Sequence, residues 1–164
     1  AGCAACRGGK NGRKLVRREM ITIVPMQERH LDAIAALEIA CFSDPWSRRS
    51  IASELENEWS LWLIAEEGDT VAGYVGSQLV PPEADVMNLA VAPEKRRMGV
   101  AQRLLDALFL ELRARGITSL ALEVRASNLA AQKLYEKNGF AQVGCRKNYY
   151  VNPREDALIL RKEL

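Results

Sequence analysis

Strong charge of one sign and long apolar segments are both missing from this sequence of 164 residues. Its 23 Lys and Arg nearly balance its 21 Asp and Glu, so the formal net charge is only +2. Proteins built to bind nucleic acid usually carry a pronounced basic surface. No apolar run approaches the roughly 20 residues that a membrane-spanning helix needs. We therefore expect no direct nucleic-acid partner and no membrane insertion.

Cysteine and histidine are also sparse, with four and one in the chain. Four cysteines do not indicate a disulfide framework in a chain of this length. Cys3 and Cys6 have the spacing of a redox or metal motif, but no second cysteine pair and no histidine cluster completes a zinc site. Cys41 and Cys145 lie in a helix-like and a strand-like run, where cysteine packs as a small core residue. We predict no metal site and a reducing, cytoplasmic location.

The chain has the length and composition of one globular domain, with 48% apolar and 27% charged residues. Residues 1–19 differ, because they are small, glycine-rich and basic and contain no apolar stretch of the kind that a signal peptide has. We interpret them as a disordered or non-native leader, with Met20 as the natural start. The alternative is a genuine basic tail that touches RNA or a ribosome. Residues 20–164 then form a single domain.

Hydrophobic periodicity predicts a succession of strands and helices in this domain. Ser47 has the position of an N-cap, Gly116 that of a glycine after a helix C-terminus, and residues 67–70 that of a hairpin turn. Strand–helix–strand connections in the second half indicate parallel neighbours, whereas hairpins indicate antiparallel ones. The expected fold is a mixed-sheet α/β or α+β domain. Its expected strands are 21–24, 61–66, 71–79, 85–91, 119–124, 141–149 and 157–164, and its expected helices are 27–42, 47–56, 100–115 and 128–138. The strand 119–124 is apolar enough to be buried on both faces.

The segment 86–105 passes from an apolar strand through a basic turn into a helix. Arg96 and Arg97 supply positive charge in the turn, and Gly99 lets the backbone come close to a ligand. The first N–H groups of a helix have no internal acceptor, and the helix dipole adds partial positive charge there. The turn is therefore predicted to hold an anion such as a pyrophosphate. It lacks the Lys-Ser or Lys-Thr of a Walker A loop and the glycines of a dinucleotide-binding fingerprint.

Residues 96–101 follow the strand end at 89–91 and resemble the coenzyme A pyrophosphate loop, Q/R-x-x-G-x-G/A, of the GNAT superfamily of N-acetyltransferases. The A-x-x-L-Y-x-x-x-G-F pattern of residues 131–140 is similar to the second signature of that superfamily. LEVRASN at 122–128 and RKNYY at 146–150 look like one group within it, the bacterial ribosomal-protein alanine N-acetyltransferases of the RimI type. The resemblance covers Met20 to the C-terminus. It implies a mixed, mostly antiparallel sheet of about six or seven strands, flanked by about four helices.

The resemblance also implies that acetyl-CoA is the cosubstrate and that no metal takes part. It implies a coenzyme contact by Asn128, which from its position alone is an ordinary helix N-cap. One side chain could fill only one of these two roles well. The other implied coenzyme-binding residues are Leu89, Ala90, Val91, Arg96, Arg97, Met98, Gly99, Val100, Ala101 and Gln102.

Two residues are candidates for the chemistry of acetyl transfer. Glu123 interrupts an apolar strand, where a carboxylate is costly unless it is paired or used, and it could accept a proton from an amine directly or through a water. The alternative is an outward-facing residue in a salt bridge with Arg125 or another base. Tyr135, from its position alone, is a core residue with its hydroxyl at the edge. The resemblance implies instead that Tyr135 is the general acid that protonates the leaving thiolate.

The acceptor implied by the resemblance is the α-amino group of an N-terminal alanine on a small-subunit ribosomal protein, acetylated by direct attack. The sequence does not determine the oligomeric state, and we favour a monomer. Residues 146–150 and 154–156 are expected to shape the acceptor site, and the helices joined at Pro45-Trp46 form a lid over it or only cover one sheet face. His30 is expected to be structural or solvated. The alternative functions are acetylation of lysines or small amines, a non-catalytic acyl-CoA-binding module, and phosphate or RNA binding through residues 95–97. Four acids could complement a basic acceptor or simply be solvated: Glu54, Glu56, Glu58 and Asp85.

Overall fold

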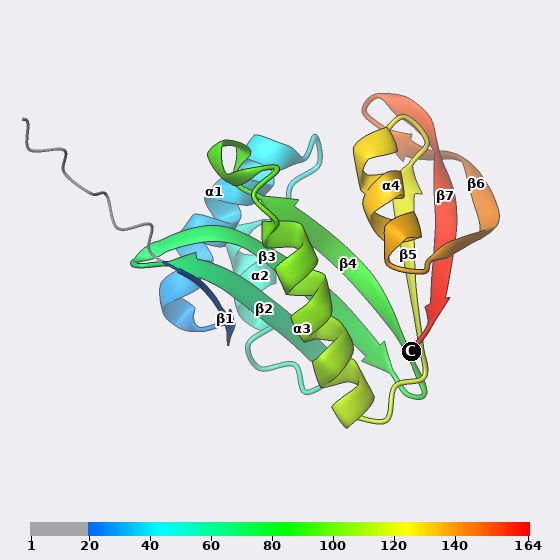
Figure 1. Ribbon diagram of the computed structural model, residues 1–164. Helices are drawn as coiled ribbons and strands as arrows, with labels where there is room; N and C mark the ends of the chain where they lie inside the picture. The colour runs from blue at the N-terminus through cyan, green and yellow to red at the C-terminus, as the bar shows by residue number, and fades with distance from the viewer. Residues whose placement is uncertain (1–19) are drawn as a thin grey trace, which may run out of the picture.

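The computed structural model describes residues 20–164, which form a seven-stranded sheet with helices on both faces (Figure 1). The strands are β1 Ile21–Pro25, β2 Ser60–Glu67, β3 Thr70–Val80, β4 Glu83–Val91, β5 Ser119–Arg125, β6 Ala141–Val151 and β7 Arg154–Glu163. Their order in the sheet is β1-β2-β3-β4-β5-β7-β6. All neighbouring pairs are antiparallel except β4 and β5, which are parallel. The predicted fold class, a mostly antiparallel mixed sheet, is confirmed.

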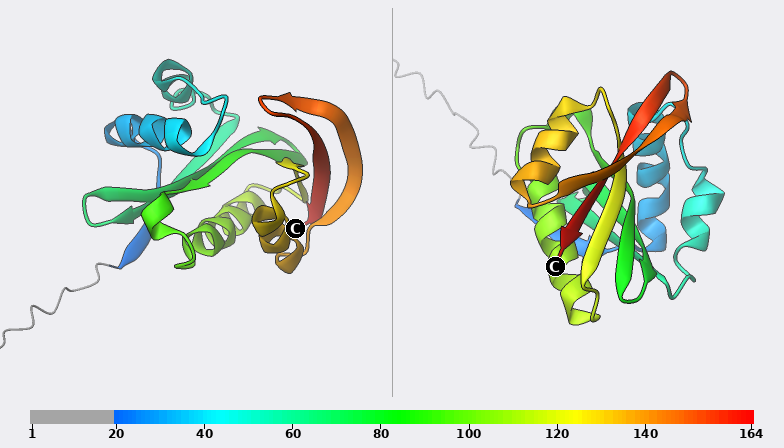
Figure 2. Two further views of the ribbon diagram at one scale, coloured as in Figure 1. Left: turned by 90° about the horizontal axis from the view of Figure 1, so that it is seen from above. Right: turned by 90° about the vertical axis from the view of Figure 1, so that its right-hand side faces the viewer.

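The helices are divided between the two faces of the sheet (Figure 2). They are α1 Leu31–Cys41, α2 Arg48–Ser53, α3 Val100–Ala114 and α4 Leu129–Lys137, with short 3-10 turns at Glu28–His30 and Pro93–Lys95. α1 and α2 lie on one face, and α3 and α4 lie on the other. α3 buries Leu104, Leu108 and Leu112 in one hydrophobic core, whereas α1 and α2 bury Ile34 and Ile51 in a second core. α1 and α3 therefore pack the apolar sides that their sequence spacing predicts.

The strands β4 and β5 are neighbours over only part of their lengths. They pair at residues 83–85 of β4 and 119–121 of β5, and beyond these residues they diverge (Figure 1). β4 also contains a bulge at Met87, the one residue of this strand without a partner in β3. The C-terminal ends of both strands are therefore not paired with each other.

Local signals in the sequence placed most elements correctly. Ser47 is the N-cap of α2, since its hydroxyl accepts the N–H of Ser50 at 3.1 Å. Gly116 has a φ of 76° and follows the end of α3, as predicted. The predicted second helix ends at Ser53 instead of residue 56. β5, α4 and β6 follow one another in the chain, but β7 lies between β5 and β6 in the sheet.

Two burial predictions are wrong. Cys145 was expected in the core, but it is exposed because β6 is an edge strand whose residues mostly face solvent. Cys41 is half-buried. β5 was expected to be buried on both faces, but Ala121 and Glu123 are only half-buried while Leu122 and Val124 are buried. The strand therefore has one covered face and one partly open face.

The predicted leader, with Cys3 and Cys6, lies outside the described residues. Within residues 20–164, no helix is both long enough and apolar enough to cross a membrane. In the same part of the chain, no three His, Cys, Asp or Glu side chains gather in a way that could hold a metal ion.

Candidate active site

The turn from β4 into α3 carries the predicted anion site. After β4 ends at Val91, the chain reaches Gly99, which is the N-cap of α3 and has a φ of 79°. The first backbone hydrogen bond at this end of the helix runs from the Arg103 N–H to the Gly99 carbonyl at 3.1 Å. The N–H groups of residues 100–102 precede that bond and have no acceptor in the described part of the chain. They are therefore available to an anion.

The side chains around this turn leave room for a ligand. A Cβ added to Gly99 would meet no atom within 4 Å, so glycine here serves the left-handed backbone and not a crowded neighbour. Arg97 also has a positive φ, of 61°. The Arg96 guanidinium lies 3.4 Å from the Val91 carbonyl through Nε and 3.5 Å from the Cys41 Sγ through Nη2. Two exposed arginines beside free helix N–H groups fit the charge of a pyrophosphate.

Tyr135 lies on α4 with only 7% of its surface exposed. Its ring packs edge-on against Phe140, with the centroids 5.4 Å apart. Burial raises the pKa of its hydroxyl to about 12, and the nearby Tyr150 contributes to that rise. The position alone predicted a core tyrosine, and this is confirmed. A hydroxyl that keeps its proton at neutral pH also suits a proton donor.

Asn128 caps α4, as its position in the sequence predicts. Its Oδ1 accepts the N–H of Ala131 at 3.2 Å, while the residue itself is exposed. The cap holds the N-terminus of α4 next to the end of β5. A coenzyme contact by Asn128 stays a prediction.

Glu123 is held on the partly open face of β5. Its Oε1 lies 3.3 Å from the Arg146 Nε of β6, and 32% of its side chain remains exposed. Arg125 instead pairs with Glu155, at 3.2 Å. The salt-bridge alternative for Glu123 is therefore realised, with Arg146 and not Arg125 as the base. A partly exposed carboxylate in a weak surface pair remains accessible to a substrate.

Tyr150 on β6 lies within electrostatic range of both predicted catalytic residues; the sequence predicted it only as part of the acceptor-site segment 146–150, without a role of its own. Burial raises the pKa of its hydroxyl, and the Arg125 guanidinium, 4.1 Å from the ring centroid, acts in the opposite direction. The charge of Glu123 also raises the pKa of Tyr150, and Tyr150 raises that of Tyr135. The structure therefore brings groups from β5, α4 and β6 within electrostatic range of one another.

A buried carboxylate on α1 is a second feature that sequence reasoning missed. Glu38 is 0% exposed and accepts hydrogen bonds from the Asn88 amide at 2.7 Å, the Trp46 N–H at 2.9 Å and the Tyr74 hydroxyl. Burial, followed by the hydrogen bond to Glu38, raises the pKa of the Tyr74 hydroxyl. A signal was present, because Glu38 follows Ile34 by one helical turn and so occupies the apolar side of α1.

His30 has the structural role that was expected. It is buried, its Nδ1 accepts the Gln27 N–H at 2.9 Å, and its Nε2 lies 2.7 Å from the Glu66 carboxylate. Arg29 also contacts Glu66. The hydrogen bonds from Arg29 and His30 lower the pKa of the Glu66 carboxyl.

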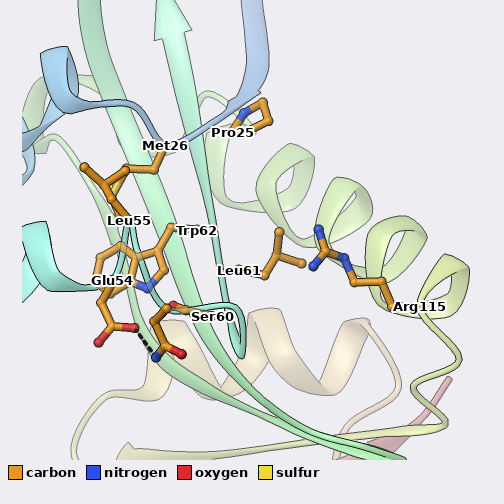
Figure 3. Close-up of a pocket in the computed structure, with 9 residues that line it drawn as sticks. Pro25, Met26, Glu54, Leu55, Ser60, Leu61, Trp62 and Arg115 are labelled. Atoms are coloured by element: carbon orange, nitrogen blue, oxygen red, sulfur yellow. Dashed lines mark hydrogen bonds between the residues drawn. The ribbon is translucent and has the colours of Figure 1, made fainter.

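Of the four acidic residues considered for acceptor binding, Asp85 lies on the strand beside Glu123, because it pairs with Ala121, two residues before Glu123 on β5. Glu58 lies just before β2. The first residue of β2 pairs with Gln78 of β3, and Gln78 pairs with Asp85 of β4, so Glu58 and Asp85 lie at the same end of the sheet. Glu54 lies in the same region and lines a pocket of about 170 Å³ together with Arg115, at the C-terminal end of α3 (Figure 3). α3 has 15 residues, about 22 Å at ~1.5 Å per residue, and separates this region from Gly99.

The pocket itself contains two buried polar atoms without a hydrogen-bond partner in the described residues, the Ser60 Oγ and the Trp62 Nε1 (Figure 3). Buried polar atoms beside a cavity of this size are commonly satisfied by water. None of the predicted catalytic or coenzyme-binding residues lines this pocket, so it is separate from the candidate active site.

Comparison with known proteins assigns the chain that carries this site to a family. The pattern of the Acetyltransferase (GNAT) family matches residues 31–140, which include the β4–α3 turn, Glu123 and Tyr135. The chain is 38% identical over 143 residues to an Escherichia coli (strain K12) protein named ribosomal protein bS18-alanine N-acetyltransferase, a match that covers 86% of this chain and 96% of that protein. The chain belongs to the GNAT acetyltransferase family.

Further known proteins are similar to this GNAT acetyltransferase in sequence or in fold. A Haemophilus ducreyi protein with the same name as the Escherichia coli one is 40% identical over 138 residues, covering 81% of this chain and 93% of that protein. The crystal structure of the ribosomal-protein-S18-alanine N-acetyltransferase from Escherichia coli superimposes with a TM-score of 0.81 at 38% identity, over 88% of this chain and 94% of that one. Ard1 from Thermoplasma volcanium, at 23% identity and a TM-score of 0.81, shares the fold.

Proposed function

We propose that this GNAT acetyltransferase transfers an acetyl group from acetyl-CoA to the α-amino group of an N-terminal alanine on a small-subunit ribosomal protein. The observation that carries the proposal is the 38% identity to the Escherichia coli alanine N-acetyltransferase over nearly the whole of both chains. Residues 20–164 form the catalytic domain, and the enzyme acts as a monomer in the cytoplasm. Its acceptor is a protein N-terminus and not a nucleic acid.

The residues of the β4–α3 turn and the end of β4 would hold the coenzyme. The free N–H groups of residues 100–102 and the charges of Arg96 and Arg97 suit its pyrophosphate. Residues 89–91 lie beyond the part of β4 that pairs with β5, so β5 does not occupy their backbone groups. Met98 and Gly99 complete the turn, and Asn128 lies at the adjoining start of α4.

Acetyl-CoA, when bound, supplies an acetyl thioester. An α-amino group has an ordinary pKa near about 8, so only modest help is needed to present it uncharged. The carboxylate of Glu123 accepts the proton that the amine loses, directly or through a water. The hydroxyl of Tyr135 donates a proton to the thiolate sulfur that leaves. The raised pKa of Tyr135, about 12, keeps that proton in place at neutral pH.

A mass spectrum tests this proposal. A peptide that begins with the N-terminal residues of an alanine-starting ribosomal protein is incubated with acetyl-CoA and the full chain. We expect a single added acetyl group on the N-terminal residue. The controls are the same peptide with its N-terminus blocked, a peptide with only internal lysines, and free polyamines. Acetylation of polyamines or lysines alone would overturn the proposed acceptor, and coenzyme binding without acetylation of any amine would favour a non-catalytic module.

A further inference from the structure

Arg125 ends β5 and joins two segments that are far from it in the sequence. Its Nη2 donates to the Ser43 hydroxyl at 3.2 Å and to the Asn152 carbonyl at 3.3 Å. Its Nη1 donates to the Pro153 carbonyl at 3.1 Å and to the Glu155 carboxylate at 3.2 Å. One guanidinium therefore bridges the link between α1 and α2, residues 42–47, and the turn between β6 and β7.

The surroundings of Arg125 hold its side chain in this orientation. The Tyr150 ring lies under the guanidinium at 4.1 Å, a cation–π contact. Glu155 also accepts the backbone N–H of Ser127, and this bond together with Arg125 keeps the pKa of the Glu155 carboxyl below its ordinary range. Arg125 is 25% exposed and Glu155 is 16% exposed in their side chains, so the pair is shielded from most of the solvent.

The α1–α2 link is fixed from its other end as well. The Trp46 N–H donates to the buried Glu38 carboxylate at 2.9 Å, whereas Ser43 is held by Arg125. Glu38 belongs to the same helix that leads into the link, so this contact is local. The bond from Arg125 to Ser43 connects residues 82 positions apart. Arg125 thus ties the link to the β5–β7 side of the sheet.

The side chains of Arg125 and Glu123 extend from the same face of β5, because residues two apart on a strand share a face. The two segments that Arg125 joins therefore lie on the side of the sheet where Glu123 is exposed. We propose that Arg125 is a positioning residue: it sets the spacing between the α1–α2 link and the β6–β7 turn, and this spacing determines how tightly the acceptor peptide binds beside Glu123. This proposal rests on the proposed function, since its kinetic readout is the binding of the acceptor peptide.

The kinetic test replaces Arg125 with lysine. Lysine keeps the charge but lacks the planar set of donors that reaches both segments at once. We expect Arg125→Lys to raise the KM for an alanine-starting peptide about tenfold, the value for loss of one charge-assisted hydrogen bond. The kcat and the KM for acetyl-CoA should stay within about twofold of the wild type. An equal loss in kcat and in coenzyme KM, or an unchanged peptide KM, would overturn the positioning role.

Arg161→Lys is the matched control. Arg161 also has several acceptors, with Glu83 at 2.6 Å, Ser119 at 2.9 Å and Glu163 at 3.3 Å, but it lies where β5 begins. The same substitution there disrupts a comparable network whose partners belong neither to the α1–α2 link nor to the β6–β7 turn. We expect no change in the peptide KM. A rise equal to that of Arg125→Lys would show that any loosening of β7 has this effect and would overturn the proposal.

Hydrogen exchange supplies a readout that does not depend on the substrate. In Arg125→Lys, the amides of residues 42–47 and of residues 150–155 should exchange faster together, while those of α3 keep the wild-type rate. Faster exchange in only one segment, or in neither, contradicts the proposal. If the wild-type enzyme acetylates no alanine peptide, the proposed function fails, and the exchange result still decides whether Arg125 joins the two segments.

Discussion

The β4–α3 turn is built from residues that are neighbours in the sequence, whereas the segments around Arg125 come from three separate parts of the chain. In the turn, Gly99 and the N–H groups of residues 100–102 need only a local backbone shape to present themselves to an anion. Around Arg125, Ser43 and Asn152 reach the same guanidinium only because the sheet places β5 beside β7. The β4–α3 turn is thus formed by local backbone conformation, whereas the contacts of Arg125 depend on how the strands are ordered in the sheet.

This difference matches the different demands of the two proposed substrates, the coenzyme and the acceptor chain. A pyrophosphate is common to every reaction that uses coenzyme A, and a local turn with free N–H groups suffices to hold it. An acceptor chain must be recognised by shape and by several side chains, so its site needs segments whose spacing can be tuned. Changes in the turn should therefore affect the coenzyme, and changes in the long-range contacts should affect the acceptor.

The largest expected effect, on kcat, comes from substituting the two proposed catalytic residues, Glu123 and Tyr135. Glu123→Gln and Tyr135→Phe should each lower kcat about 100-fold or more, the usual range for loss of a general base or acid. Binding of acetyl-CoA, measured by calorimetry, should persist in both variants. Steady-state rates with an alanine-starting peptide measure the loss.

Arg146→Ala is the matched control for Glu123. It removes the partner at 3.3 Å but keeps the carboxylate. If Glu123 serves only to hold β6, Arg146→Ala should lower kcat as much as Glu123→Gln does. We expect instead a small change, because an exposed ion pair contributes only about 0–1 kcal/mol. Wild-type rates in both Glu123→Gln and Tyr135→Phe would refute the assigned roles.

The buried Glu38 tests whether the acceptor half depends on long-range contacts. Glu38→Ala leaves the donors of Trp46, Tyr74 and Asn88 without their acceptor, and should lower the free energy of unfolding by about 3 kcal/mol. It should also raise the KM for the peptide, because the α1–α2 link loses its contact with α1, and leave the KM for acetyl-CoA unchanged. Chemical denaturation and steady-state kinetics measure the two effects.

Glu66→Ala is the control for that substitution. Glu66 also accepts from two partners, Arg29 and His30, but these lie at the start of α1 and do not touch the link. It should lower stability without a specific change in the peptide KM. Equal changes in the peptide KM for the two variants would mean that general destabilisation, and not the position of the link, determines acceptor binding.

A smaller effect is expected at the local turn. Gly99→Ala forces a residue with a Cβ into a left-handed conformation, which costs about 1–2 kcal/mol. Part of this strain should appear as a higher KM for acetyl-CoA, with the peptide KM unchanged. Gly116→Ala carries the same strain at the other end of α3, where φ is 76° and an added Cβ also meets no atom within 4 Å. Both variants should lose similar stability by thermal denaturation, but only Gly99→Ala should affect the coenzyme.

The smallest effect is expected from alkaline pH. Burial raises the pKa of Tyr135 from 10.0 to about 12, so the hydroxyl keeps its proton well above neutral pH. The rate should rise as the amine of the peptide loses its proton near about pH 8 and then stay level to about pH 11. The raised pKa also contributes stability that is present below pH 10 and is lost as the pH rises through about 12. A fall in kcat centred near pH 10 would contradict the role of Tyr135 as the acid.

Local patterns in the sequence were enough to predict the elements and the candidate coenzyme site. The N-caps at Ser47 and Asn128 and the glycines at 99 and 116 depend on hydrogen bonds and φ values that a few neighbouring residues decide. Glu123 stood out for the same reason, as a charge in an apolar strand. The resemblance to a known superfamily then implied roles for residues whose local pattern was ambiguous, such as Tyr135.

The partners of these residues were decided by the tertiary structure. Arg146 and not Arg125 contacts Glu123, because β7 lies between β5 and β6 in the sheet and β6 curves over that face. Cys145 is exposed for a related reason, since β6 is the strand at the edge of the sheet and its residues mostly face solvent. The contacts of Arg125 and Glu38 join residues up to 82 positions apart. Periodicity reports which side of an element is apolar, but strand order and register determine which element lies against it.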